Sequence, residues 1–404
     1  MSVGLVLGLY IDDFLAFILA AKLFDKILKG IGLSIGSCVR PNFTRAIAVE
    51  SLKYGLKTMP AGIYGNVLGF LSFLVTFSIL PQYAAWMGMI SLARNFTGMI
   101  NLPGTIKSNT DFSVSESMNN GKYRLSHYYI AMELKWRYFL TVYLWITIII
   151  MIPIALGSML SIFGKNWLPA LGLIPLLSIP EVINIFEKPM SFTQVNHPGY
   201  DQAIGLLQST ISFLWYMFLI YVVNVNLTIT LFILKDIPIQ VGFMAVHWII
   251  LHFKIMPIRF RDFAMQAFIL PIIPLGIYAA FCWLFGVYIF PLGGRLIGEI
   301  PFAIITIAMV LFVWPIIIVC PLMGIFGAWD DYSADSFRRT VELSGPSKFM
   351  MSAMYKASLF AYNRSPLKGR FPIKGSDLAA KEALELEEFK RLHDVRNVKQ
   401  LENA

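Results

Sequence analysis

Long apolar runs separated by short polar linkers dominate the pattern of side chains along this chain. Nine of these runs have about the length that a helix needs to cross a bilayer, roughly 20 residues. They cover residues 3–24, 57–80, 82–104, 137–160, 167–188, 204–230, 238–256, 264–290 and 300–326. The pattern predicts an all-α, polytopic membrane protein with about nine transmembrane helices.

Lysine and arginine gather in alternate linkers between the apolar runs. The linkers after the first, third, fifth, seventh and ninth runs carry most of them, whereas the intervening linkers carry Lys165, Lys235 and Arg295. The positive-inside rule places the linkers that are rich in lysine and arginine in the cytoplasm. We therefore expect a multi-pass protein of the cell (plasma) membrane, with its N-terminus outside and its C-terminus in the cytoplasm.

Composition supports a membrane protein and excludes several other classes. Apolar residues make up 57% of the chain and charged residues only 14%, against about 25% charged residues in soluble domains. The basic residues that give the net charge of +9 cluster in the linkers. The charge therefore reflects membrane topology and does not indicate nucleic-acid binding. No cysteine pair, His/Cys/Asp cluster, GxSxG, P-loop or HExxH motif has the spacing of a metal or catalytic site. We expect no enzymatic activity, no cofactor and no metal.

The same pattern predicts the domain organisation. Residues 1–326 form the transmembrane domain, and residues 327–404 form a cytoplasmic tail that ends in a helix. Within the transmembrane domain, residues 1–56 hold the first helix and a cytoplasmic linker. Residues 57–256 form a six-helix lobe, and residues 257–326 add two helices.

Arg94 is a full charge near the middle of the third run. Such a charge costs about 2.5–3.5 kcal/mol in the hydrocarbon by insertion scales, so we expect it to face protein or a water-filled cavity. Ser91, Gly98 and Asn101 share its face at helical spacing. A stripe of polar and small residues predicts a helix that lines a polar cavity. The alternative is that the long side chain of Arg94 extends to the nearer membrane interface and places its charge in water.

Four other polar residues in the runs have two open interpretations each. Asn66 either packs between helices or lines a cavity. Glu181, in a run bent by prolines, either pairs with a cation or protonates, or else lies at the interface. Asp12 and Asp13 in the first run either form a proton or cation site, or precede a shorter span that begins near Phe14.

Several short segments resemble one transporter family, in the order in which the family has them. They are residues 52–56, Gly88 within residues 84–89, residues 113–116 with 120–122, residues 160–167, and the tail segments 344–346 and 365–372. The chain resembles the multidrug/oligosaccharidyl-lipid/polysaccharide flippase superfamily, in particular its polysaccharide-exporter branch. The tail segments are similar to those of archaeal members.

The resemblance implies the second lobe of a MATE-like fold with two extra helices. Members of the superfamily have two lobes of six helices, and aligned on the segments above this chain begins at the family's sixth helix. About five helices of the first lobe are then missing. The resemblance implies that a partner chain supplies them, that the reading frame is truncated, or that the chain is a degenerate relative. A rocking transporter needs two halves around its central site.

The family implies a function without chemistry on the substrate. Its members flip a polyprenyl-phosphate-linked oligosaccharide from the inner to the outer leaflet, so membrane lipid and lipid-linked sugar are the expected partners. Arg94 is the candidate for the phosphate, because a guanidinium binds it in a bidentate manner. Asn66, Asn101 and Ser91 are further substrate-binding candidates.

Two rival functions are open. A cation-coupled drug exporter of the same superfamily would use Glu181, Asp12 and Asp13 for coupling or for binding cations. A non-transporting membrane subunit would instead dock a glycosyltransferase through its tail.

Overall fold

The computed structural model is mostly helical over the part of the chain that it describes. The described residues are 2–29, 34–36, 45–163, 168–187, 197–223 and 228–402. No strand occurs within these ranges, as the apolar pattern predicts. The chain divides into two compact units, Met1–Met59 and Pro60–Ala404. The first unit holds α1 (Ser2–Lys29) and α3 (Arg45–Thr58).

The second unit contains the helices that can cross a membrane. Among the described residues, six helical segments are long and apolar enough: Pro60–Ile79, Tyr123–Gly157, Leu168–Phe186, Pro198–Tyr221, Ile229–Ile255 and Met265–Ile297. A seventh candidate joins Glu299–Val313 to Pro315–Ile325, with a bend of 40° between the two pieces. Pro315 accounts for the bend, because its ring removes one helical hydrogen bond and clashes with the preceding turn. The protein is therefore an all-α polytopic membrane protein.

The prediction of nine spans is wrong over the described ranges, where six or seven segments qualify. The expected span at 82–104 is broken: α5 (Tyr83–Thr97) has 15 residues and tightens into a 3-10 turn at Gly98–Asn101. Fifteen residues extend about 22 Å, short of the roughly 30 Å hydrocarbon core. Glycine is a poor helix former and Arg94 interrupts the apolar surface, which explains the early end. The expected span at 3–24 falls in α1, where about half of the side chains lie outside the described part.

Helix α7 is the longest element and the centre of the second unit. It follows α6 (Gly104–Asn119) after a turn in which Gly121 has φ +73°, and it runs from Tyr123 to Phe163, 41 residues. That length is about 60 Å, twice the hydrocarbon thickness. Its charged residues all precede Tyr138, so the start of α7 extends beyond the hydrocarbon. They are Arg124, Glu133, Lys135 and Arg137.

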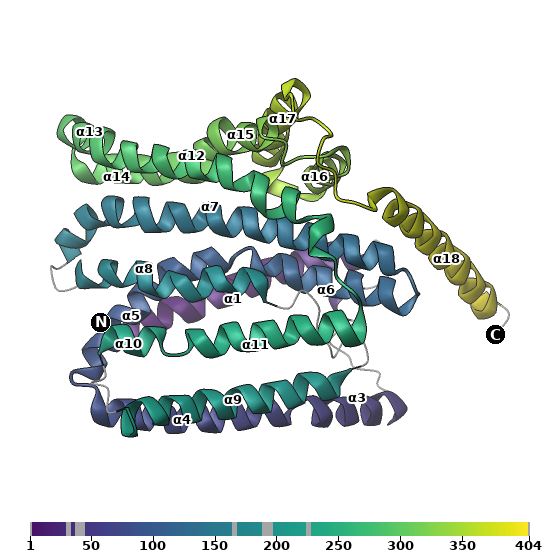
Figure 1. The fold of residues 1–404 in the computed structure, drawn as a ribbon, viewed down its shortest axis with the longest axis horizontal. Coiled ribbons are helices and arrows are strands. Elements are labelled where there is room, and N and C mark those ends of the chain that lie inside the picture. Colours follow the sequence, from purple (N-terminus) through teal and green to yellow (C-terminus); the bar gives the residue numbers. More distant parts are fainter. Residues whose placement is uncertain are drawn as a thin grey trace. The chain divides into compact units, whose positions relative to one another are not determined.

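Further helices complete this unit (Figure 1). In chain order they are α4 (Pro60–Ile79), α8 (Leu168–Ile183) with the 3-10 turn Asn184–Phe186, α9 (Pro198–Tyr221), α10 (Ile229–Leu234) and α11 (Ile237–Ile250), which continues as a π-helix over Leu251–Ile255. α8 packs on both α5 and α7, and α9 packs on α4.

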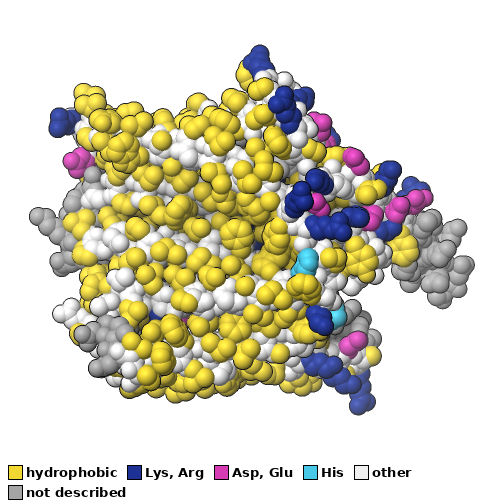
Figure 2. Space-filling model, viewed as in Figure 1, with side chains coloured by type: hydrophobic (Ala, Val, Ile, Leu, Met, Phe, Trp, Pro, Cys, Tyr) yellow, Lys and Arg dark blue, Asp and Glu magenta, His cyan; other side chains and the backbone are white. Residues whose placement is uncertain are grey.

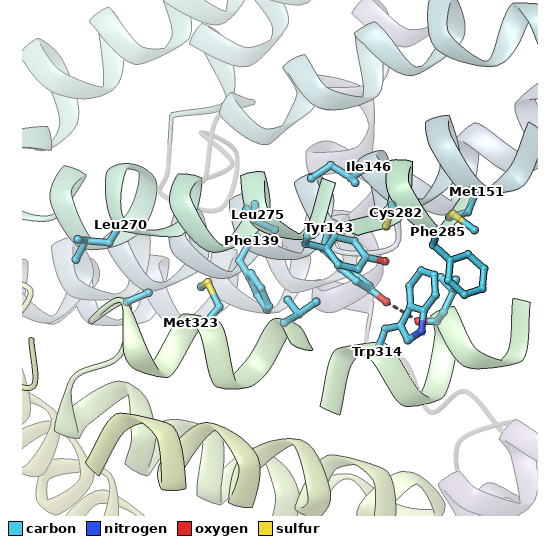
Figure 3. Close-up of a cluster of buried hydrophobic side chains, with 14 of the residues drawn as sticks. Phe139, Tyr143, Ile146, Met151, Leu270, Leu275, Cys282, Phe285, Trp314 and Met323 are labelled. Atoms are coloured by element: carbon cyan, nitrogen blue, oxygen red, sulfur yellow. Dashed lines mark hydrogen bonds between the residues drawn. The ribbon is translucent and has the colours of Figure 1, made fainter. Parts of the chain in front are cut away.

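The C-terminal helices of the membrane region pack on α7 through aromatic side chains (Figure 3). These elements are α12 (Leu270–Leu284), α13 (Phe290–Ile297), α14 (Glu299–Ala308) and α15 (Cys320–Ile325), with π-helical turns at Met265–Ile269, Phe285–Ile289, Met309–Val313 and Pro315–Val319. The Tyr143 hydroxyl donates to the Val310 carbonyl at 2.7 Å. The ring of Trp314 lies edge-on to Phe285, with the centroids 5.0 Å apart.

The tail after α15 is folded and docks on the membrane helices. It consists of α16 (Asp331–Leu343), a 3-10 turn at Gly345–Ser347, α17 (Lys348–Arg364) and α18 (Ser376–Glu402). α18 matches the expected C-terminal helix. Its Glu382 carboxylate accepts the Leu125 N–H of α7 at 2.8 Å. α17 packs on α15, where a Cβ on Gly324 would lie 2.7 Å from the Ser358 carbonyl oxygen.

The surface of the second unit separates apolar from basic residues. Figure 2 shows hydrophobic side chains along α7, α9, α11 and α12, and Lys and Arg side chains gathered where α7 begins and α11 ends. Arg124, Arg259 and Lys374 surround one cavity there. All three residues lie in segments that the pattern of basic residues predicts on one side of the membrane, and the shared cavity agrees with that prediction.

Candidate functional site

Helices α4 and α9 form a closely packed pair that is held by polar contacts. The Thr76 and Tyr216 hydroxyls lie 2.7 Å apart, and the Tyr64 and Thr210 hydroxyls lie 3.1 Å apart. Gly65 permits this approach, because a Cβ at its position would lie 3.0 Å from the Ser209 Oγ. Small and hydroxyl residues are the usual means of helix association in a bilayer.

A groove of about 440 Å³ lies along this pair within its membrane-spanning length. It extends from Gly65 to Thr76 on α4, eleven helical steps that cover about 16 Å. Its polar lining consists of Ser72, Thr76, Gln208, Ser209, Ser212, Lys235 and Asp236. Lipid tails cannot hydrogen-bond to such side chains, so the lining is suited to a polar ligand.

Lys235 brings a cation to the groove from the short connection between α10 and α11. Its ammonium lies 2.6 Å from a carboxylate oxygen of Asp236 and 4.6 Å from the ring centre of Tyr216. The Lys235 carbonyl accepts the Trp215 indole N–H at 2.9 Å, which fixes this connection against α9. The lysine side chain is only 11% exposed, so the groove holds a partly desolvated ion pair.

A second polar cluster joins α5, α8 and α11. The Asn101 amide donates to a Glu181 carboxylate oxygen at 2.5 Å, and Asn184 approaches the same oxygen at 3.4 Å. The Gln240 amide donates to the Asn184 side-chain oxygen at 2.5 Å. Arg94 interacts electrostatically with Glu181, without an ion pair between them within 4 Å. The cluster therefore connects three helices through hydrogen bonds between side chains.

A buried ion pair on α7 extends this cluster. Arg137 Nη1 lies 3.1 Å from a Glu133 carboxylate oxygen, and the two side chains are 3% and 0% exposed. The same guanidinium donates to the Asn184 carbonyl through Nη2. This pair was not predicted from the sequence, although its i, i+4 spacing of opposite charges was a usable signal.

The structure brings together some of the residues that the sequence singled out and separates others. Asn101 and Glu181 are in contact, with Arg94 near them. Ser91 is exposed on α5, and Asn66 is exposed on α4, outside the lining of the groove. Asp12 and Asp13 belong to α1, and their side chains lie outside the described part.

Lys235 stood out in the sequence only as a linker residue, and no role was predicted for Gln208 and Ser212. The shortness of the connection around Lys235-Asp236, between two apolar segments, could have marked Lys235.

The fold and the groove together define a class: a polytopic, all-α membrane protein with a polar groove inside its membrane-spanning region. Comparison with protein-family models, with curated proteins and with solved structures finds no match to this chain. Its function is therefore argued from the residues alone.

Proposed function

We propose that the protein is a transporter that flips a polyprenyl-phosphate-linked oligosaccharide across the cell membrane, for the assembly of a surface polysaccharide or glycan. The observation that carries this proposal is the polar groove between α4 and α9, within two helices whose exposed faces are otherwise mostly apolar. Hydroxyl and amide side chains match sugar hydroxyls, because both groups donate and accept hydrogen bonds. The lipid tail stays in the bilayer.

The phosphate of such a substrate requires a cation. Lys235 is the cation at the groove, and Arg94 is the cation that the family resemblance favours. We propose that Lys235 binds the phosphate after Asp236 releases the Lys235 ammonium. Arg94 does not line the groove, and we propose it as a second phosphate contact in the course of transport. A cation exporter fits the groove less well, because its carboxylate, Asp236, is already neutralised by Lys235 at 2.6 Å.

The proposal includes an orientation and a partner. The basic end, where Arg124 and Arg259 lie, faces the cytoplasm, as the positive-inside rule requires. The membrane helices form the second lobe of a MATE-like arrangement, and a partner chain supplies the other lobe. Purified chain in liposomes is then expected to bind the substrate but not to move it until that partner is added.

Binding of substrate to the groove is the direct test. The protein in nanodiscs is exposed to a photoactivatable polyprenyl-phosphate sugar, and crosslinking to α4 and α9 is measured. Ser72→Leu with Ser212→Leu fills the groove with apolar volume, so we expect loss of most crosslinking. Ser78→Leu is the matched control, because Ser78 lies on the same helix, exposed and outside the groove. Equal crosslinking in the filled and control variants would exclude the groove as the site.

Arg94 is tested separately from the groove. We expect Arg94→Ala to abolish transport of the labelled lipid-linked sugar in membranes that contain the partner, with normal membrane insertion. We expect Arg94→Lys to retain only part of the transport, because the lysine ammonium is a point charge and cannot bind the phosphate in the bidentate manner of the planar guanidinium. Unchanged transport by a well-folded Arg94→Ala protein would remove Arg94 from the mechanism and leave the groove proposal standing.

A further inference from the structure

A second cavity, of about 400 Å³, lies at the basic end of the second unit. Three segments that are far apart in the sequence form it: the start of α7, the connection between α11 and α12, and the residues just before α18. Its lining consists of Tyr123, Arg124, His127, Ile255, Met256, Pro257, Arg259, Asp262, Lys374 and Gly375. The cavity shares no residue with the groove between α4 and α9.

Backbone hydrogen bonds hold these segments together. The Arg259 N–H donates to His127 Nε2 at 3.2 Å, and the Lys374 N–H donates to the Asp262 carbonyl at 3.1 Å. The side chains of Arg259 and Lys374 are therefore not needed to hold the segments in place. Because His127 Nε2 accepts a hydrogen bond, its imidazole is neutral in this arrangement.

The lining carries three cations and one carboxylate. The ion pairs of the described residues include none of Arg124, Arg259 and Lys374, in contrast to Arg338 and Arg339, which both pair with Asp335. With Asp262 counted, the formal charge of the lining is +2, from three positive groups and one negative group. Unpaired cations around a cavity of this size indicate an anionic ligand.

The surroundings indicate that this ligand comes from the membrane. Tyr123, Phe253 and Phe260 are large aromatic side chains at or beside the cavity, and they are 55%, 75% and 40% exposed. Exposed aromatic residues next to basic ones are typical of the boundary between membrane and water. Figure 2 shows the basic patch directly beside the hydrophobic surface. Basic pockets in this position bind the head groups of anionic lipids.

We propose that this cavity binds the phosphate group of an anionic membrane lipid through Arg124, Arg259 and Lys374. The lipid then ties the start of α7 to the tail and to the connection between α11 and α12. This inference is independent of the proposed transport function, because it concerns different residues and a resident lipid.

The test measures the affinity of the full-length protein in detergent for a fluorescent short-chain phosphatidylglycerol, by anisotropy. The variant Arg124→Gln/Arg259→Gln/Lys374→Gln is expected to bind at least about tenfold more weakly, because it loses charge-assisted hydrogen bonds. The control Lys254→Gln/Arg261→Gln/Arg370→Gln removes the same charge from exposed residues outside the cavity. We expect it to change the affinity by less than about threefold.

Asp262→Asn provides a test that does not depend on loss of binding. It removes the one carboxylate from the lining while its main-chain carbonyl still accepts the Lys374 N–H, so we expect tighter binding. Equal weakening in the pocket and control variants, or unchanged or weaker binding in Asp262→Asn, would overturn the proposal. Complete displacement of the probe by millimolar inorganic phosphate would identify a soluble anion as the ligand and overturn the lipid assignment.

Discussion

Asp330 joins the tail to α7, and its replacement is expected to destabilise the protein in a defined way. The side chain is 3% exposed and caps α16, with Oδ1 accepting the Ser333 N–H at 2.7 Å. Lys135 of α7, also 3% exposed, donates to the Ser333 hydroxyl at 2.7 Å. The Ile373 N–H donates to the other carboxylate oxygen at 3.4 Å. One carboxylate thus serves a helix cap, a buried lysine and the segment that leads into α18.

The expected magnitudes follow from these separate roles. Loss of a helix cap costs about 1 kcal/mol. Lys135 and Asp330 interact through the Ser333 hydroxyl, which Lys135 approaches and which donates to Asp330, and removal of one of two coupled buried charges costs about 3 kcal/mol. Asp330→Ala loses both and is expected to lower the free energy of unfolding by about 4 kcal/mol. Asp330→Asn keeps an acceptor for the cap, so it loses only the charge, about 3 kcal/mol. Lys135→Met leaves the Asp330 carboxylate buried without its cation and costs a similar amount.

The double variant Lys135→Met/Asp330→Asn tests the coupling. It removes both buried charges, so we expect stability within about 1 kcal/mol of the wild type and a coupling energy above about 2 kcal/mol. Unfolding is followed by tryptophan fluorescence during titration with SDS in mixed micelles. Asp335→Asn is the control, because Asp335 is exposed and pairs only on its own helix. Additive single effects in the double variant would refute the coupling of α7 to the tail through these charges.

The same pair predicts how acid acts on the protein. Burial raises the pKa of Asp330, but Lys135 and the hydrogen bonds from Ser333 outweigh it and hold this pKa below its ordinary value. A carboxylate whose pKa is lower in the folded state stabilises the fold above its unfolded pKa of about 3.9, and this contribution is lost as pH falls through the folded pKa. Lys135→Met raises the folded pKa, so its acid-induced loss of stability is expected to begin at higher pH. If the stability of the wild type and of Lys135→Met fell over the same range of acidic pH, this account would be contradicted.

Two further predictions address the ion pair on α7 and the topology. Arg137→Leu is expected to destabilise the protein by about 3 kcal/mol in the same titration, and Glu133→Gln added to it should recover part of the loss; no recovery would mean that the pair is not coupled. The topology is tested in a variant without native cysteines, with a membrane-impermeant thiol reagent. A cysteine introduced at Ser347 should react only from the cytoplasmic side. A cysteine introduced at Leu296, which is 85% exposed, should react only from the outside. Reaction of both from one side would refute the proposed orientation.

Apolar patterning identified the membrane helices because burial in lipid is a local requirement on each segment. The seven candidate segments all overlap expected runs. Patterning failed at α5, because counting apolar residues does not detect that a helix tightens at Gly98 and has only 15 residues. It also placed the start of the fourth span near Arg137, whereas α7 continues as one helix back to Tyr123. Charged residues end the hydrocarbon segment of a helix without ending the helix itself.

The candidate site was less predictable, because it depends on which helices meet. Arg94 stood out in the sequence since a charge in an apolar run is costly wherever that helix packs. The groove instead depends on the contact between α4 and α9, where Thr76 and Tyr216 are 140 residues apart. The short connection around Lys235 is a weak signal in the sequence, and the position of Lys235 at the groove emerges only once this connection packs against Tyr216. The position of a charged residue within an apolar run therefore identifies residues that are costly to bury. A binding surface inside a membrane depends instead on which helices pack together, and only this packing creates a place for a ligand.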